Sequence, residues 1–262
     1  KTAYEIVSRD WSSDVCSSDL RVALVTTANF YVGPDTARIL ARRGHDLVVG
    51  DADPDLVTEL ESYGATVVNV DGGSRARTEE DYARLLAAGV ERFGQVHAAT
   101  MFSGRVVTGK FVDSTQDDLD TVYQGCVVQP YHFLKAVVPH MVENKDGQIL
   151  VLTSAAGSRP VFGAPLYSSL RAAGTMLARN VAEEVVRSNV QVNILGTNFM
   201  DFPEFLRATG GTDPEVRKLI EQQVPMRRLG GVEECAYSCA SFLDGTSRFI
   251  TGQWMSYSGG WS

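Results

Sequence analysis

Three polar side chains in the second half of the chain have the types and the spacing of an acid–base centre. Ser154 follows an apolar run, twelve residues separate it from Tyr167, and three more separate Tyr167 from Arg171. Residues four positions apart on a helix share a face, so the tyrosine and the arginine are expected side by side. A guanidinium stabilises a neighbouring phenolate and helps a tyrosine to accept a proton. The alternative is a half-buried tyrosine and a surface arginine on an ordinary helix.

The elements that would position these side chains follow from alternating strand-like and helix-like segments. Short β-branched apolar runs predict buried strands at Val22–Thr26, Asp46–Val49, Thr66–Val70, Val96–Thr100, Gln148–Thr153, Val190–Ile194 and Gln253–Tyr257. Helical patterns lie at Asp35–Arg43, Pro54–Tyr63, Thr78–Phe93, Ser114–Asn144, Pro165–Arg187 and Val232–Leu243. This alternation predicts one α/β domain over residues 21–262, a doubly wound Rossmann-like fold with a parallel seven-stranded sheet. Ser154 and the helix of Tyr167 would meet at the edge where parallel strands end and ligands bind.

Two segments depart from this alternation. Residues 196–231 hold three phenylalanines beside paired glycines and prolines. They predict either a partly helical flap over the ligand edge or a surface excursion with apolar anchors. The first twenty residues are crowded with serine and aspartate and lack the apolar segment of a signal peptide. We expect residues 1–20 to be a non-native or disordered leader and exclude them from the fold.

Charge and composition limit the partners. The net charge is −8, which argues against nucleic acid or an anionic membrane as the main partner. No apolar run reaches the roughly 18 residues that a membrane-spanning helix needs. The chain has four cysteines: Cys16, Cys126, Cys235 and Cys239. They form no CxxC pair and show no metal-type spacing with the histidines. We therefore expect a cytoplasmic protein with buried free thiols, no metal, and histidines that pack rather than catalyse: His97, His132 and His140.

The first strand–turn–helix unit, from Arg21 to Asp51, has the layout of a dinucleotide-binding motif but lacks most of its glycines. Thr27 and Tyr31 occupy glycine positions of such a turn, and only Gly33 remains. Side chains there would stop the backbone from approaching a pyrophosphate. Asp51 stands where NAD enzymes bind the ribose hydroxyls, and we interpret it as a remnant or a helix N-cap. The motif therefore predicts that no nucleotide cofactor binds.

From residue 21 to residue 262 the chain resembles the short-chain dehydrogenase/reductase superfamily, with departures at the functional positions. Arg171 replaces the lysine of Tyr-x-x-x-Lys, "TMFS" replaces "NNAG" after the fourth strand, and Cys126 replaces a relay asparagine. Thr197 and Asn198 replace Pro-Gly after the sixth strand. Ser-x12-Tyr-x3-Arg together with Thr-x4-Phe/Tyr-x-Gly is the pattern of the halohydrin dehalogenases. These enzymes resemble the reductases but have lost the cofactor.

This resemblance implies a reversible, cofactor-independent and metal-independent conversion of vicinal haloalcohols into epoxides and halide. Ser154, Tyr167 and Arg171 would be the catalytic residues. The halide, or another small anion, would bind in the former nicotinamide space, lined by Tyr31, Thr197, Asn198, Phe199 and Met200. The resemblance to the short-chain dehydrogenase/reductase superfamily implies a homotetramer.

Two alternatives stay open. The first is an NAD(P)-dependent short-chain oxidoreductase with an altered first turn, which a lysine at position 171 and glycines at positions 27 and 31 would have favoured. The second is a non-catalytic sensor of the same fold. The complete set of Ser154, Tyr167 and Arg171 argues against a sensor.

Overall fold

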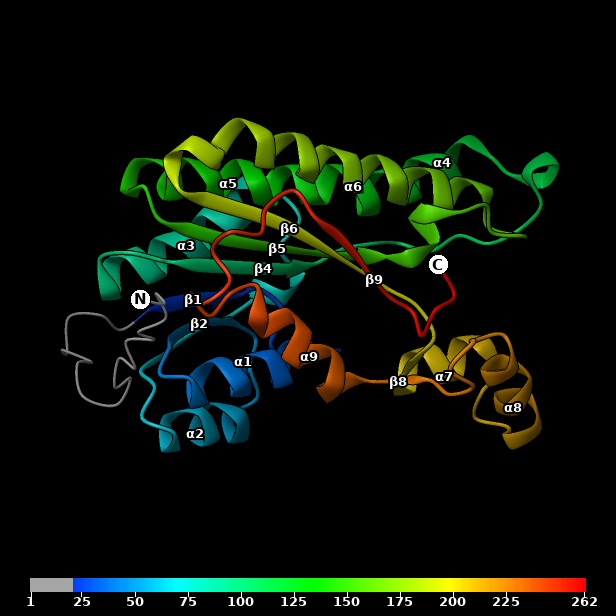
Figure 1. Cartoon of the computed structure of the whole chain (residues 1–262), viewed down its shortest axis with the longest axis horizontal. Coiled ribbons are helices and arrows are strands. Elements are labelled where there is room, and N and C mark those ends of the chain that lie inside the picture. The colour runs from blue at the N-terminus through cyan, green and yellow to red at the C-terminus, as the bar shows by residue number, and fades with distance from the viewer. Residues whose placement is uncertain (1–20) are drawn as a thin grey trace, which may run out of the picture.

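Seven parallel strands form one sheet in the order β3-β2-β1-β4-β5-β6-β9 (Figure 1). The computed structural model describes residues 21–262, so the expectation for residues 1–20 lies outside the described residues. The strands are β1 (Val22–Val25), β2 (Asp46–Gly50), β3 (Val67–Val70), β4 (Ala98–Phe102), β5 (Gly147–Ser154), β6 (Val190–Thr197) and β9 (Trp254–Tyr257). The predicted single Rossmann-like domain with a parallel seven-stranded sheet is confirmed. The direction of the strand order reverses between β1 and β4, which is where such sheets open a ligand crevice.

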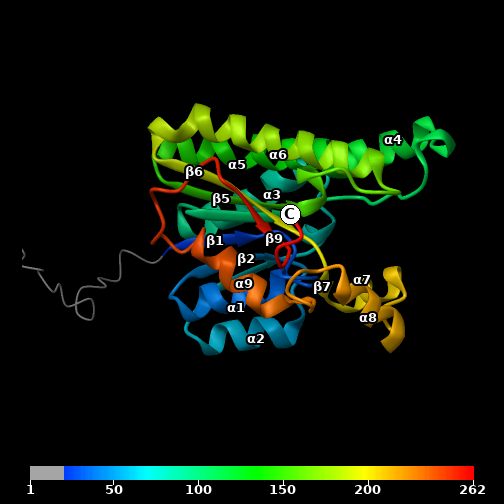
Figure 2. The same ribbon diagram turned by 45° about the vertical axis from the view of Figure 1, so that its right-hand side comes forward.

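Helices cover both faces of the sheet, and the central strands are therefore buried along their whole length. One face carries α1 (Gly33–Arg42), α2 (Pro54–Ser62) and α9 (Val232–Ser241). The other face carries α3 (Glu79–Phe93), α4 (Gln116–Tyr123), α5 (Gln129–Asn144) and α6 (Pro165–Val185) (Figures 1 and 2). Each layer of helices packs its own apolar cluster against the strands.

The helix predicted over Ser114–Asn144 is interrupted. A π-helical turn over Gln124–Val128 separates α4 from α5. At Gly125 the turn meets the loop after β4 so closely that a Cβ atom would lie 2.5 Å from the backbone nitrogen of Arg105. A π turn adds one residue to a helix without ending it, and such turns are frequent at functional sites. This one is held against the loop that leaves the carboxyl edge of the sheet.

The segment predicted as a flap lies beyond the carboxyl edge of the sheet (Figure 2). It contains β7 (Met200–Asp201), α7 (Pro203–Thr209), α8 (Pro214–Gln222) and β8 (Gly230–Gly231). The two short strands pair with each other in a separate parallel ribbon, which the sequence did not predict. None of the helices between residues 21 and 262 is long and apolar enough to cross a membrane.

Three of the four cysteines lie in the described part of the chain, and all three are buried free thiols, as predicted: Cys126, Cys235 and Cys239. Two of the histidines have packing roles. The Nδ1 atom of His97 accepts the backbone N–H of Val22 at 3.0 Å, and the Nε2 atom of His140 accepts that of Val96 at 3.1 Å. Both therefore support the amino ends of strands rather than the opposite, ligand-binding edge.

Candidate active site

Ser154 and Tyr167 come from neighbouring elements at the carboxyl edge of the sheet. Ser154 is the last residue of β5 and pairs in register with Thr197, the last residue of β6. The Ser154 hydroxyl accepts the N–H of Ala156 at 3.2 Å, which leaves its own proton free to donate to a ligand. Tyr167 lies in the first turn of α6, where Pro165 begins the helix, and its side chain is half-buried.

Arg171 is buried against the ring of Tyr167. Its side chain is 2% exposed, and the guanidinium carbon lies 5.0 Å from the centre of the Tyr167 ring. Its Nη2 atom donates to the carbonyl oxygen of Ser103 at 2.5 Å and its Nη1 atom to the Ser103 hydroxyl at 3.2 Å. The alternative of a surface arginine is therefore wrong. Between residues 21 and 262 no carboxylate lies within ion-pair distance of this cation.

Tyr31 fills the space beside the first turn. Its backbone is in the left-handed region (φ 55°), its side chain is 9% exposed, and its ring centre lies 4.5 Å from that of Phe202 and 5.1 Å from that of Phe102. Burial raises the pKa of the Tyr31 hydroxyl well above its ordinary value, and a hydrogen bond with Thr197 opposes only part of this rise. The hydroxyl therefore stays protonated near neutral pH and can donate a hydrogen bond.

The first turn leaves almost no room for a dinucleotide. The cavity between this turn and the ends of β1 and β4 has a volume of about 10 Å³, which is enough for about one water molecule. Gly33 already packs so tightly that a Cβ atom would lie 1.6 Å from the carbonyl oxygen of Thr27. The ring of Tyr31 and its aromatic neighbours occupy the space beside this turn, so a nucleotide there would have to displace them.

Asp51 is not available for a ribose in this structure, and it does not cap a helix. Its carboxylate accepts the backbone N–H groups of Gly72 and Ser74 and the Ser74 hydroxyl. The interpretation as a helix N-cap is wrong, because Asp53 occupies the N-cap position of α2. Burial alone would raise the pKa of Asp51, but the hydrogen bonds from Ser74 and Gly72 outweigh burial and lower it. The carboxylate therefore fixes the loop after β3.

The residues predicted to bind halide divide between two places. Thr197 is buried at the end of β6, beside the hydroxyl of Tyr31. Asn198 and Phe199 instead line a pocket of about 230 Å³ that the ring of Tyr31 does not line. Met200 is 2% exposed in β7 and packs against Gly230. The structure thus brings Tyr31 and Thr197 together and places the next two residues on another wall.

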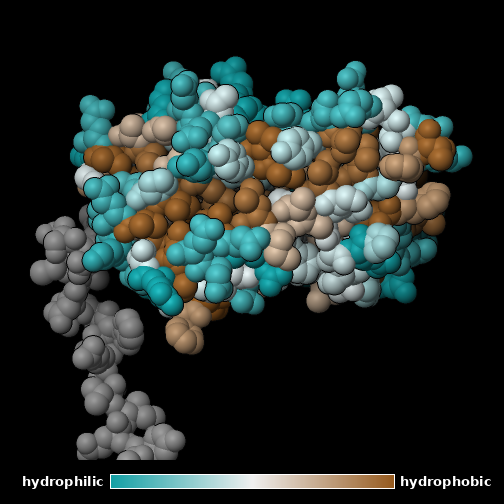
Figure 3. Space-filling model, turned by 90° about the horizontal axis from the view of Figure 1, so that it is seen from above, coloured by the Kyte–Doolittle hydropathy of each residue, from teal (hydrophilic) through white to brown (hydrophobic). Residues whose placement is uncertain are grey.

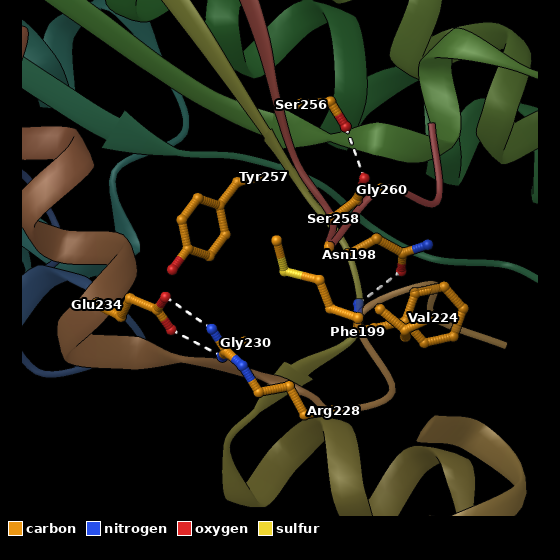
Figure 4. A pocket seen from close by; sticks show the side chains of 12 residues that line it. Asn198, Phe199, Val224, Arg228, Gly230, Glu234, Ser256, Tyr257, Ser258 and Gly260 are labelled. Carbon is orange, nitrogen blue, oxygen red and sulfur yellow. Dashed lines mark hydrogen bonds and ion pairs between the residues drawn. The ribbon is translucent and has the colours of Figure 1, made fainter. Parts of the chain in front are cut away.

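The pocket of Asn198 and Phe199 lies between β9, α9 and the residues that follow α8 (Figure 4). Its rim carries a two-pronged ion pair in which both Nη atoms of Arg228 lie 2.9 Å from the carboxylate oxygens of Glu234. The ring of Tyr257 forms another wall. The lining combines apolar side chains with hydroxyl groups, which suits a small organic molecule with one polar end.

Sequence reasoning missed two residues of the site. Ser103 and Gly104 follow β4 and contact the guanidinium of Arg171. The available signal was that "TMFS" stands in place of the superfamily's "NNAG", but this difference could not identify a contact 68 residues away along the chain. Cys126, at the expected relay position, lies in the π turn and is 1% exposed. Its sulfur is 3.8 Å from the carbonyl oxygen of Arg105.

Comparison with known proteins places the chain in a family. A family model described as enoyl-(acyl carrier protein) reductase matches residues 32–262. The chain belongs to the short-chain dehydrogenase/reductase family. It is 26% identical over 248 residues to 2,5-dichloro-2,5-cyclohexadiene-1,4-diol dehydrogenase LinX of Sphingobium indicum, covering 92% of this chain and 96% of that protein. It is also 26% identical to the 7alpha-hydroxysteroid dehydrogenase of Escherichia coli, covering 95% of this chain and 97% of that one.

A solved structure confirms the fold. YwfH, described as an NADPH-dependent reductase involved in bacilysin biosynthesis, matches with a TM-score of 0.82 at 21% identity, over 93% of this chain and 98% of that chain. These short-chain dehydrogenase/reductase relatives carry the names of dehydrogenases and reductases, and none of the three is named as a dehalogenase. The comparisons therefore show the family. The activities named for these relatives are those of oxidoreductases and not of the expected lyase.

Proposed function

We propose that this member of the short-chain dehydrogenase/reductase family is a cofactor-independent halohydrin dehalogenase. It would convert vicinal haloalcohols into epoxides and halide, and open epoxides with small anions in reverse. The observation that carries the proposal is the combination of a buried Arg171 against the ring of Tyr167 with an aromatic cluster where a dinucleotide would lie. The first favours a phenolate that can accept a proton. The second argues against a redox cofactor at the first turn, because the rings occupy the space beside it.

In the proposed reaction Tyr167, as a phenolate, takes the proton from the hydroxyl of the haloalcohol. Ser154, whose proton is free, donates a hydrogen bond to the same oxygen. The resulting alkoxide attacks the neighbouring carbon, so that a carbon–oxygen bond forms while the carbon–halogen bond breaks. The halide leaves with the bonding electrons, and in reverse Tyr167 returns its proton to the epoxide oxygen. The reaction needs one acid–base group at oxygen and one site for the departing anion.

Arg171 supplies the electrostatic contribution. Its cation lies 5.0 Å from the ring centre, and the negative charge of a phenolate spreads into that ring. At the effective dielectric constant that describes protein sites, two unit charges at this distance attract each other by about 3 kcal/mol. A neutral phenol gains only the weaker attraction between a cation and an aromatic face. The buried arginine therefore favours the form of Tyr167 that can act as a base.

The departing halide needs hydrogen-bond donors on the far side of the reacting carbon. Tyr31 offers a hydroxyl group at the carboxyl edge that burial keeps protonated. The Thr197 hydroxyl beside it donates to the carbonyl oxygen of Thr153 at 3.5 Å and would turn from that oxygen to the anion. We assign the halide to this pair, with Asn198, Phe199 and Met200 completing the loop. A neutral donor suits this task because it stabilises the developing charge and still releases the ion.

A nicotinamide-dependent oxidoreductase is the second candidate. It is favoured by the relatives, which are named as dehydrogenases and reductases. This function would require the first turn to open, because the packed rings of Tyr31, Phe102 and Phe202 occupy the space beside it. It would also require the carboxylate of Asp51 to exchange its three hydrogen bonds for a ribose.

Halide release from a panel of haloalcohols, with no nucleotide added, tests the proposal. We expect release by the parent protein and a loss of about 10²–10⁴-fold in Tyr167→Phe, the range for a general acid–base group. Tyr123→Phe is the matched control, because Tyr123 is 44% exposed on α4. Calorimetric titration with NAD(H) and NADP(H) decides between the candidates. Micromolar affinity for either cofactor, with no halide released, would favour the oxidoreductase.

Two further features of the proposal follow from the sequence. Free thiols are typical of a reducing compartment, and we propose a cytoplasmic location. The resemblance to the short-chain dehydrogenase/reductase superfamily implies a homotetramer, which we propose for this chain.

A further inference from the structure

The loop after β4 holds the guanidinium of Arg171 at its first residue. Ser103 is 1% exposed and accepts hydrogen bonds from both terminal nitrogens, Nη2 at its carbonyl oxygen and Nη1 at its hydroxyl. The Ser103 hydroxyl donates in turn to the carbonyl oxygen of Leu152 in β5 at 3.4 Å, and the Ser103 N–H donates to the same oxygen at 3.3 Å. The guanidinium is thereby tied to the central strands of the sheet.

The next residue of the loop gives the guanidinium its space. Gly104 has a φ of 134°, and a Cβ atom there would lie 1.8 Å from Nη2 of Arg171. A side chain at position 104 would thus be strained by the backbone and would collide with the cation. Glycine is the residue that satisfies both constraints at once.

The π turn between α4 and α5 fixes the loop relative to α6. On one side Gly125 meets the backbone of Arg105. On the other side Gly174 of α6 approaches so closely that a Cβ atom would lie 2.1 Å from the carbonyl oxygen of Cys126. The loop and the helix that carries Arg171 are therefore pressed against the same turn, which leaves the guanidinium little freedom to move.

We propose that Ser103 and Gly104 form a cradle that positions the cation of Arg171 over the ring of Tyr167, where it stabilises the negative charge that Tyr167 carries in the reaction. The hydrogen bonds of the guanidinium in the described part of the chain all go to Ser103, and its Nε atom has no partner there. A buried cation without a carboxylate is stabilised by the phenolate that it promotes. The inference rests on the proposed function for its catalytic meaning, because the cradle residues touch Arg171 and not the substrate.

The planar fork of arginine is what allows both contacts. Two nitrogens can bind Ser103 while the plane still lies above the tyrosine ring. A lysine ammonium is a compact point charge without this fork, and it would require a different set of acceptors. The cradle therefore fits an arginine at position 171 and would not hold a lysine in the same way.

Two pairs of variants test the cradle. Gly104→Ala is compared with Gly109→Ala, because Gly109 is in the same loop, also has a positive φ, and has open space at its Cβ position. Ser103→Ala is compared with Thr100→Val, because the Thr100 hydroxyl also links β4 to β5, donating to the carbonyl oxygen of Leu150 at 3.0 Å. Each control thus repeats the local change without touching Arg171.

Phenolate formation at Tyr167 is measured by ultraviolet difference titration of each protein against the same protein carrying Tyr167→Phe. The pH dependence of halide release is measured in parallel. We expect Gly104→Ala and Ser103→Ala to move the midpoint of phenolate formation and the acid limb of the pH–rate profile upward by about one pH unit, the lower end of the effect of a nearby charge. The controls should leave both unchanged. In an Arg171→Met background, Gly104→Ala should add no further shift, because the two changes act through one interaction.

Unshifted midpoints in both cradle variants, with melting temperatures like that of the parent, would overturn the proposal. So would an equal shift in the controls. A parent protein that releases no halide, yet shows the shift in phenolate formation, would refute the dehalogenase function and still support the cradle.

Discussion

Arg171 is a cation placed where a phenolate can balance its charge. It is 2% exposed, it lies over the ring of Tyr167, and its hydrogen bonds go to the uncharged Ser103. An uncompensated buried charge is costly to folding. This unfavourable burial occurs at Arg171, which the proposed mechanism requires. Such local destabilisation is typical of functional sites.

Replacing Arg171 with lysine tests the geometry of this charge. The positive charge is kept, but the two bonds to Ser103 cannot both form. We expect halide release to fall by about tenfold, equivalent to about 1.4 kcal/mol of transition-state stabilisation, and the pH optimum to move. Arg179→Lys on the exposed side of α6 is the control. Equal rates of halide release for parent and Arg171→Lys across the pH range would show that the exact position of the cation does not matter and that only its charge does.

Tyr31→Phe separates the ring from the hydroxyl. The ring contacts with Phe102 and Phe202 persist, so we expect stability to fall by only about 1 kcal/mol, the usual net contribution of one hydrogen bond. Inhibition of epoxide opening by bromide should weaken, because one donor to the anion is lost. Tyr82→Phe, whose hydroxyl bonds to the carbonyl of Ala76 far from the site, is the matched control. Unchanged bromide inhibition would remove Tyr31 from the halide site.

At the scale of elements, the two edges of the sheet have different tasks. The carboxyl edge carries the catalytic candidates, whereas the amino edge is supported by histidines that accept backbone N–H groups at the starts of strands. Burial lowers the pKa of His97 and of His140, and burial lowers that of His45, just before β2, to about 4. Each of these rings is therefore neutral in the folded protein at neutral pH.

The lowered pKa values of these histidines predict that the protein loses stability in mild acid. An unfolded histidine binds a proton below about pH 6.5. A group whose folded pKa is lowered therefore stabilises the fold fully above that pH, and the stabilisation is lost as the pH falls towards the folded pKa. For His45 the loss should continue to about pH 4, with a slope of at most about 1.4 kcal/mol per pH unit. Melting temperatures of the parent protein and of His45→Leu between pH 6.5 and pH 4 measure this loss. Curves of melting temperature against pH that run parallel for the two proteins would contradict the prediction.

One face of the molecule is broadly apolar. Seen from above, hydrophobic residues run in broad bands over the side that α5 and α6 cover (Figure 3). A groove of about 240 Å³ lies there, lined by Tyr131, Leu134, Lys135, Val138, Pro139, Leu177, Val181, Glu184 and Val185. Large apolar surfaces with a few charges at their rim are typical of contacts between subunits.

Leu177→Glu tests whether this face joins subunits. A charge in the middle of an apolar contact cannot be paired when it is buried, so we expect the assembly to dissociate into smaller species. The same substitution at Leu219, which is 61% exposed on α8, should leave the mass unchanged. Sedimentation velocity gives the mass of each protein. A parent protein that sediments as a monomer would contradict the expected tetramer directly.

The elements and the spacing of the acid–base residues could be predicted from the amino-acid sequence. Apolar β-branched runs predicted the seven strands within a few residues, because strands buried on both faces, as the central ones are, require continuous hydrophobicity. The interval from Ser154 through Tyr167 to Arg171 spans one strand end and one helical turn, which are local features that the chain encodes directly. The bulk of Thr27 and Tyr31 in the first turn was likewise visible without a structure.

The surroundings of these residues depend on contacts between segments far apart in the chain. The contact of Ser103 with Arg171 joins positions 68 residues apart, and no local periodicity records such a distance. The bonds from Asp51 to the loop after β3, and the division of Thr197 and Asn198 between two walls, depend likewise on how the loops turn back at the carboxyl edge. Periodicity specifies which face of an element is buried. Which side chains meet across elements is set by crossover connections and close packing, and these exist only in the folded chain.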